Sequence, residues 1–154
     1  MSWQELATNT LTGTATTLDS GTFTAKKYLF VLIFAPSARV WLRVNSDPGA
    51  NYAYRRSEEG GSDSTGVNKN EIRLDRNSTE SFFSYFYIYN EATLEKLFTL
   101  LDISNNNNGS GNAPKRQEFA FKWADTSNQI TEVNLISSTG NFDIGTTITV
   151  MGAD

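Results

Sequence analysis

The feature that most constrains this chain is the two-residue period of its apolar side chains within short runs. Two runs show it clearly, residues 39–45 and residues 116–123. On their apolar sides they carry Val40, Leu42 and Val44 in the first run, and Phe119, Phe121 and Trp123 in the second. Successive side chains of a β-strand point to opposite faces, so each run predicts a half-buried strand.

Further strands are expected between clusters of Ser, Thr, Asn and Gly, which are typical turn residues. They cover residues 3–6, 15–18, 28–34, 52–56, 71–74, 82–89, 96–103, 130–136 and 144–151, the last with Ile144, Ile148 and Val150 facing the core. Residues 90–98 have only a loose helical period and predict a turn into a strand. We therefore expect an all-β chain, with residues 1–154 forming one domain. Its predicted fold is an antiparallel β-sandwich, jelly-roll-like, with about ten short strands.

Two segments are apolar or aromatic on both faces, residues 28–34 and residues 82–89. Such strands are expected at the centre of a sheet or covered on both sides. A covered outer face requires a second contact. Two sources of that contact stay open at this point: a loop of the same chain, or another subunit.

Two polar stretches, residues 57–70 and residues 104–114, have the composition of long loops. Long loops on a rigid sandwich often carry binding residues, but they can also be tolerated insertions. The sequence alone does not decide whether either loop binds a ligand or calcium.

The chain contains no histidine and no cysteine. This excludes Ser-His-Asp triads, histidine-containing metal sites, thiolate sites and disulfides. No phosphate-binding glycine loop is present, so we expect no cofactor and no metal. The net charge of −4 and the lack of a basic tract disfavour nucleic-acid binding. The longest apolar run is much shorter than a bilayer requires, and no signal peptide is seen, so we expect no membrane association.

Carboxylates are the remaining candidates for chemistry. A glycosidase needs two, and Glu118 is the best candidate acid, although the sequence identifies no second carboxylate for it. Calcium could draw oxygen ligands from the polar segments, but their spacing does not match a known calcium loop. The residues considered for calcium are Asp47, Asn51, Glu58, Glu59 and Asp63. We expect no catalytic residue and no enzyme activity.

Exposed aromatic rings could stack on the rings of a sugar. The candidates are Trp3, Trp41 and Tyr54. Packing against a loop or a subunit is the commoner use of aromatic residues in sandwiches. Together with Tyr87, these residues form the candidate surface for a partner or a glycan.

Three segments, residues 42–54, 109–118 and 122–130, resemble small virion structural proteins of tailed bacteriophages, notably marine ones. The resemblance spans most of the chain, and its motifs are structural rather than catalytic. It implies a role in capsid decoration or in a tail or fibre part, with the major capsid protein or other virion proteins as partners. It also implies that the chain is made in the host cytoplasm and assembled on the exterior of the virion.

The sequence thus predicts a non-enzymatic virion structural protein that decorates or cements a phage capsid through protein-protein contacts. A homo-oligomer is expected, with the aromatic strand faces as subunit contacts. The alternative is a carbohydrate-binding module, or a tail or fibre component, used in host attachment.

Overall fold

The computed structural model describes residues 2–37, 39–74 and 79–154, which form twelve β-strands. The strands of the first half are β1 (Gln4–Thr10), β2 (Thr17–Asp19), β3 (Tyr28–Ala35), β4 (Val40–Val44), β5 (Tyr52–Glu58) and β6 (Ser64–Lys69). Those of the second half are β7 (Ile72–Leu74), β8 (Phe82–Tyr89), β9 (Lys96–Ser104), β10 (Lys115–Trp123), β11 (Val133–Ser137) and β12 (Thr147–Ala153). Among the described residues there is no helix long and apolar enough to cross a membrane.

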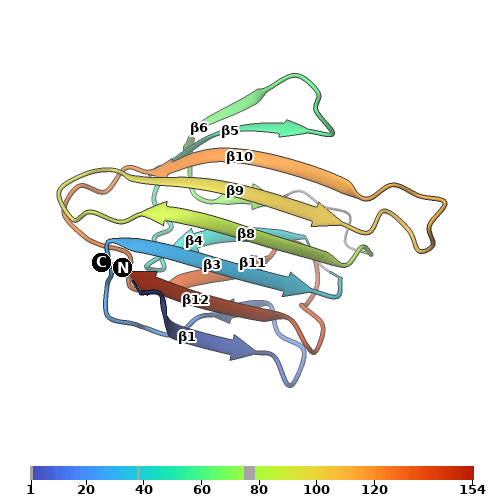
Figure 1. The fold of residues 1–154 in the computed structure, drawn as a ribbon, viewed down its shortest axis with the longest axis horizontal. Helices are drawn as coiled ribbons and strands as arrows, with labels where there is room; N and C mark the ends of the chain where they lie inside the picture. Colours follow the sequence, from blue (N-terminus) through green and yellow to red (C-terminus); the bar gives the residue numbers. More distant parts are fainter. Residues whose placement is uncertain (1, 38, 75–78) are drawn as a thin grey trace.

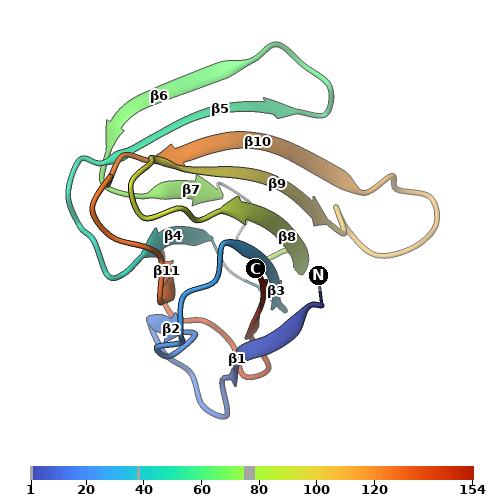
Figure 2. The same ribbon diagram turned by 60° about the vertical axis from the view of Figure 1, so that its left-hand side comes forward.

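The strands form two antiparallel sheets. The larger sheet has eight strands in the order β1-β12-β3-β8-β9-β10-β5-β6, and it runs across Figure 1 from β1 to β6. The smaller sheet has four strands in the order β2-β11-β4-β7. It lies behind the larger sheet in Figure 1, and the turned view in Figure 2 shows all four of its strands. The two sheets therefore enclose a core between their inner faces.

The strand order is that of a jelly roll with two added hairpins, β5–β6 and β9–β10. Without these hairpins, eight strands remain, four in each sheet. One sheet then joins the first, eighth, third and sixth of them, and the other joins the second, seventh, fourth and fifth. This alternation of strands between two sheets is the double-sheet jelly-roll arrangement. The predicted all-β, jelly-roll-like sandwich is confirmed, and both hairpins extend the larger sheet beyond β8.

The core is built from the residues that alternation placed inside. The inner side chains of β4 are all buried, and so are Phe119, Phe121 and Trp123 of β10, as predicted from the two runs. The smaller sheet adds Leu18, Ile72, Leu74, Val133 and Leu135 from β2, β7 and β11. Continuous contact among these side chains forms one hydrophobic cluster, which is what fixes the two sheets face to face.

The prediction of a loop over residues 57–70 was wrong in most of its length. Strand β5 continues to Glu58, a turn with positive φ at Glu59 and Gly60 follows, and β6 pairs with β5 from Ser64 onward. Strand β6 is an edge strand whose side chains are almost all exposed, so it lacks the apolar alternation by which strands are recognised. The segment 105–114, in contrast, is a connection between β9 and β10, as expected.

Ile144 was also placed wrongly. It is 61% exposed, and β12 begins only at Thr147. A turn precedes the strand, with Gly145 at φ 90° and the Thr146 amide donating to the Asp143 carbonyl. The turn breaks the two-residue period, so Ile144 does not share the inward direction of Ile148 and Val150.

Candidate interaction surface

The outer face of the larger sheet is apolar over three adjacent strands, β3, β8 and β9. Its outward side chains are Tyr28, Phe30, Leu32, Phe34, Phe83, Tyr85, Tyr87, Tyr89, Leu97, Thr99, Leu101 and Ile103. None of them is charged. We call these residues, together with Trp3, the apolar face.

Strand register makes this face continuous. Phe30 lies opposite Tyr87, and Tyr87 lies opposite Thr99. A parallel row joins Phe34, Phe83 and Ile103. Because neighbouring strands lie about 4.8 Å apart, these rows form one surface rather than separate patches.

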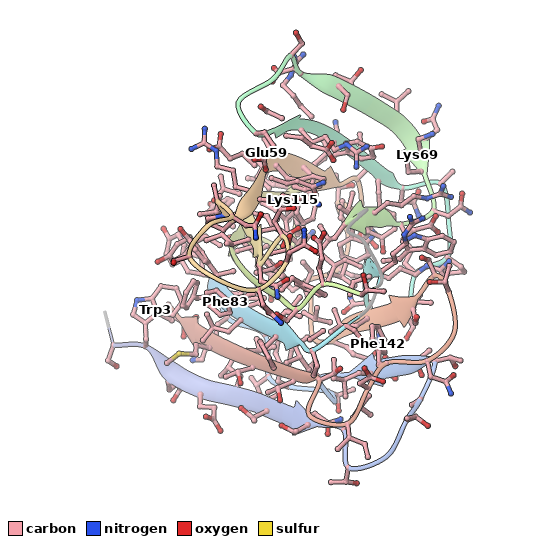
Figure 3. All side chains as sticks on the ribbon, turned by 90° about the vertical axis from the view of Figure 1, so that its right-hand side faces the viewer. Trp3, Glu59, Lys69, Phe83, Lys115 and Phe142 are labelled. Carbon is pink, nitrogen blue, oxygen red and sulfur yellow. The ribbon has the colours of Figure 1, made fainter. Side chains whose placement is uncertain are left out.

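The apolar face is open to solvent. Leu97 is 55% exposed and Tyr87 51%, while Phe34 and Phe83 are 46% and 41% exposed. Figure 3 shows Trp3 and Phe83 on one side of the molecule. The sequence left two sources of cover open, a loop of the same chain and another subunit. Among the described residues, no loop of the chain covers this face, and only Trp3 packs on one corner of it. Exposed apolar patches of this kind mark interaction sites.

The inner face of the same strands carries more charge than the outer one. Lys96 is fully buried, and its Nζ donates to the carbonyl oxygens of Ala92, Leu94 and Asp125 at 2.8–3.1 Å. Burial lowers the Lys96 pKa, and the attraction of Asp125 partly offsets this. Asp102 is also fully buried and accepts a hydrogen bond from Ser84. These strands therefore do contain charged residues, and it is only their outward side that lacks them.

Aromatic rings of the apolar face pack on one another. The rings of Phe30 and Tyr87 are stacked, with centroids 4.6 Å apart. Trp3 meets both rings edge-on at 6.3 Å, which ties the segment before β1 to this corner. One face of the Tyr87 ring is therefore already occupied, which suits side-chain packing better than stacking on a sugar.

Two shallow hollows flank Leu97. The first, of about 430 Å³, is lined by aromatic residues that include Trp3, Tyr28, Tyr87 and Tyr89. The second, of about 490 Å³, has small outward side chains at its base, Ala53 and Ala120. Leu97, Phe98 and Thr99 line both hollows. The surface therefore has a ridge at Leu97 between two depressions.

Charges appear where the face ends, on β10 and β5, and they form pairs within the chain. The Nζ of Lys122 lies 2.7 Å from Oε2 of Glu95, and Arg55 contacts Asp63 at 2.9 Å. A third pair joins Arg116 to Glu118 at 3.8 Å. This rim therefore carries both positive and negative side chains, which are paired with one another within the chain.

Of the four residues predicted for the partner or glycan surface, the structure brings together only Trp3 and Tyr87. Trp41 lies on β4, on the outer side of the smaller sheet, with the Arg73 guanidinium 4.8 Å from its ring centroid. Tyr54 packs against Phe119, and its ring passes so close to Gly66 that a Cβ there would lie 2.5 Å from Tyr54 Cε1. Trp41 and Tyr54 are engaged in contacts within the chain.

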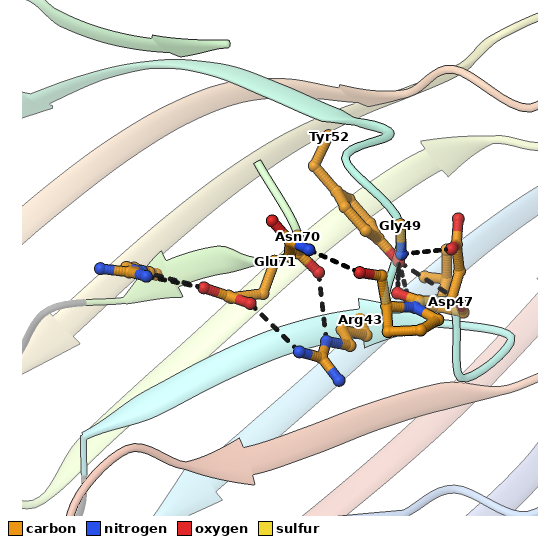
Figure 4. A network of polar contacts seen from close by, with 9 residues as sticks. Arg43, Asp47, Gly49, Tyr52, Asn70 and Glu71 are labelled. Carbon is orange, nitrogen blue, oxygen red and sulfur yellow. Dashed lines mark hydrogen bonds and ion pairs between the residues drawn. The ribbon is translucent and has the colours of Figure 1, made fainter. Parts of the chain in front are cut away.

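A polar network tethers the smaller sheet to the 45–51 loop, as Figure 4 shows. Glu71 is buried and contacts Arg43 at 3.2 Å and Arg73 at 2.9 Å. Asn70 donates to the Pro48 carbonyl at 2.7 Å, and Arg43 donates to the Asn70 carbonyl at 3.1 Å. These contacts give the outer side of the smaller sheet a charged and internally bonded surface.

The calcium candidates fall into two groups. Asp47 and Asn51 bond each other beside a polar cleft of about 500 Å³, where Trp123 Nε1 also donates to Asp47. Burial raises the Asp47 pKa, but hydrogen bonds from Asn51, Trp123 and the Gly49 amide outweigh it, so the pKa is lowered. The other candidates lie at the hairpin of β5 and β6. Within the described ranges, no three acidic side chains converge as a metal site would require.

Glu118 lies on the exposed side of β10, beside Arg116. It lines a small hollow of about 260 Å³ together with Asp63, a carboxylate that the sequence did not connect with it. Each of these carboxylates contacts an arginine. Asp63 and Glu118 are therefore each engaged in a surface ion pair, with Arg55 and Arg116 respectively.

The contribution of β9 to the apolar face was missed by the sequence analysis, although residues 96–103 were predicted as a strand. The signal was present in the alternation of Leu97, Leu101 and Ile103. It is obscured because Lys96 and Asp102, whose residue types are usually exposed, lie on the buried side of the strand.

Comparison of the chain with protein-family models, with curated proteins and with solved structures found no match.

Proposed function

We propose that this chain is a non-enzymatic structural protein that assembles with other proteins through its apolar face. One observation carries the proposal: eleven of the twelve outward side chains of β3, β8 and β9 are apolar or aromatic, and none is charged. An antiparallel sheet ordinarily exposes a polar outer face. A sheet that keeps its charges inside and at the rim is built to be covered.

The resemblance to phage virion proteins gives the proposal its setting. In that setting the chain decorates or cements a capsid, or belongs to a tail or fibre part, and contacts the major capsid protein or another virion protein. The jelly-roll arrangement is compatible with this, because the fold occurs in viral capsid domains as well as in lectins.

The setting is tested on intact virus particles produced from the genome that encodes this chain. An antibody raised against the purified protein is expected to label the exterior of the particles in electron micrographs. The matched control is the same antibody after absorption with the purified chain. Intact particles without label, and without the chain in their mass spectra, would refute the virion assignment.

The carbohydrate-binding alternative has weaker support from the side chains. Trp41 has a guanidinium over its ring, and Tyr54 packs over Gly66. The lining of the hollow at Trp3 is apolar and aromatic, whereas sugar sites also need polar groups to fix hydroxyls. A glycan array probed with the full chain decides this: saturable binding that is lost in Trp3→Ala would favour the alternative over protein assembly.

A further inference from the structure

We infer that the first occupant of the apolar face is a second copy of this chain, which forms a two-fold symmetric dimer with the two larger sheets packed face to face. The inference rests on the proposed function, because it names a partner for the same surface. Three observations carry it: the area, the charge and the shape of the face.

The exposed area matches what a stable dimer buries. Six large side chains here are 36–55% exposed, namely Trp3, Phe34, Phe83, Tyr87, Leu97 and Ile103. Since a large aromatic residue can bury 150–250 Å², these six leave roughly 500 Å² open to solvent. The half-buried side chains between them raise this to roughly 700–800 Å², close to the ~800 Å² that each partner contributes to a standard interface.

The charge of the face favours a copy of itself as partner. A charged partner would find no complementary charge on β3, β8 or β9. In a two-fold interface each residue that contacts another is contacted in return, so any uncompensated charge near the axis would meet its own kind. The apolar face has none, and the rim pairs Lys122–Glu95 and Arg55–Asp63 are neutralised within each chain.

The shape of the face is also self-complementary. Leu97 stands between two hollows that share Thr99 as a lining residue. With the two-fold axis in the plane between the two sheets, parallel to β9 and just beside Thr99, Leu97 of each copy would enter a hollow of the other. Two sheets packed in this way lie about 10 Å apart, as in the interior of a sandwich.

The oligomeric state is the direct test. Sedimentation equilibrium of the purified full chain, over a range of about 1 to 100 µM, is expected to give twice the mass of one chain. The double variant Tyr87→Lys plus Leu97→Lys is expected to raise the dissociation constant at least 100-fold, because two like charges per copy would be buried unpaired. Both side chains are more than half exposed, so the far-ultraviolet circular dichroism should stay unchanged. The urea midpoint should become independent of protein concentration, because the variant no longer gains stability from association.

The matched control is Ile144→Lys. This side chain is 61% exposed, but it lies in the turn before β12, outside the apolar face. The control is expected to remain dimeric. A wild-type mass of one chain throughout the range would overturn the inference, and so would a dimer that persists in the double variant.

A cross-linking measurement tests where the axis lies. The chain has no cysteine, so Thr99→Cys introduces a single thiol per copy. A short bismaleimide is expected to link Thr99→Cys chains into covalent dimers, and to leave Ile144→Cys chains mostly unlinked. Equal linking of both variants would contradict the proposed geometry.

The outcomes separate the two proposals. A dimer in solution together with unlabelled virus particles would leave the inference standing and refute the virion setting. A monomer in solution that is nevertheless found on the particles would refute the inference alone.

Discussion

The two faces of β3, β8 and β9 distribute charge in the reverse of the usual way. The inner face buries Lys96 and Asp102 within the sandwich, whereas the outer face presents Phe34, Phe83 and Tyr87 to solvent. A buried charge is tolerated where the fold supplies hydrogen-bond partners, as the three carbonyls do for Lys96. An exposed apolar row has no such internal compensation. The difference teaches that the inner charges are compensated within the fold, whereas the outer face is uncompensated, which supports the assembly role that we propose for it.

The outer side of the smaller sheet sharpens this contrast. Its aromatic residue, Trp41, is covered by the Arg73 guanidinium, which in turn contacts buried Glu71. Here a half-buried ring is paired with a cation. No such cation lies over the centre of the apolar face in the described residues, where only Lys27 approaches two rings, those of Tyr28 and Tyr89 at one corner.

The largest effect on stability is expected from the inner face. Lys96→Met keeps most of the apolar stem but leaves the carbonyls of Ala92, Leu94 and Asp125 without their donor. The free energy of unfolding should fall by about 3 kcal/mol, the cost of several unsatisfied acceptors. Urea titration at a fixed protein concentration measures it. A loss below about 0.5 kcal/mol would show that water replaces the ammonium at no cost, and that the inner charge does not serve stability.

A smaller effect is expected on the outer side of the smaller sheet. Arg73→Ala removes one of the two cations at Glu71 and uncovers Trp41, while Arg43 remains. Because Arg73 is about half exposed, the expected loss is about 1 kcal/mol, measured in the same titration. The double variant Arg43→Ala plus Arg73→Ala should lose more than the two single losses combined, because buried Glu71 then has neither cation. Additive losses would mean that the network is not coupled.

Acidification should destabilise the fold at Asp47, in the 45–51 loop, and should have the smallest effect on the contacts of the apolar face. The Asp47 pKa is lowered in the fold, so Asp47 contributes stability above its unfolded pKa. That contribution is lost as the pH falls below the ordinary carboxyl pKa of 3.8 and through the lower, folded pKa. Urea midpoints should therefore fall less on acidification in Asp47→Asn than in the wild type.

The apolar face carries no carboxylate, so the dissociation constant of the dimer should change by less than about threefold between pH 7 and pH 4.5, where the chain stays folded. Sedimentation equilibrium at the two pH values measures it. A steep change would show that rim carboxylates take part in the interface.

Local alternation predicted the strands well and their order not at all. Strands β4 and β10 were recognised because one face of each is buried, which leaves the two-residue period in the sequence. Strand β6 was missed because an edge strand exposed on both sides carries no such period. The order of strands, in which β12 pairs with β1 and β3, depends on contacts between distant segments, which local patterns do not encode.

The candidate surface could be predicted in part. Two-sided apolar character revealed the contributions of β3 and β8. The roles of Trp41 and Tyr54 could not be read from the sequence, because the groups that occupy their rings come from other strands, Arg73 on β7 and Gly66 on β6.

The place of β12 has a consequence for how the chain folds as it is synthesised. This strand is synthesised after the other eleven described strands, yet it lies inside the larger sheet, between β1 and β3. Until it emerges, β3 keeps an open edge and apolar side chains on both faces, a combination that invites pairing with other nascent chains. Completion of the larger sheet therefore waits for β12, and truncation before Thr147 should yield insoluble chains rather than a smaller soluble domain.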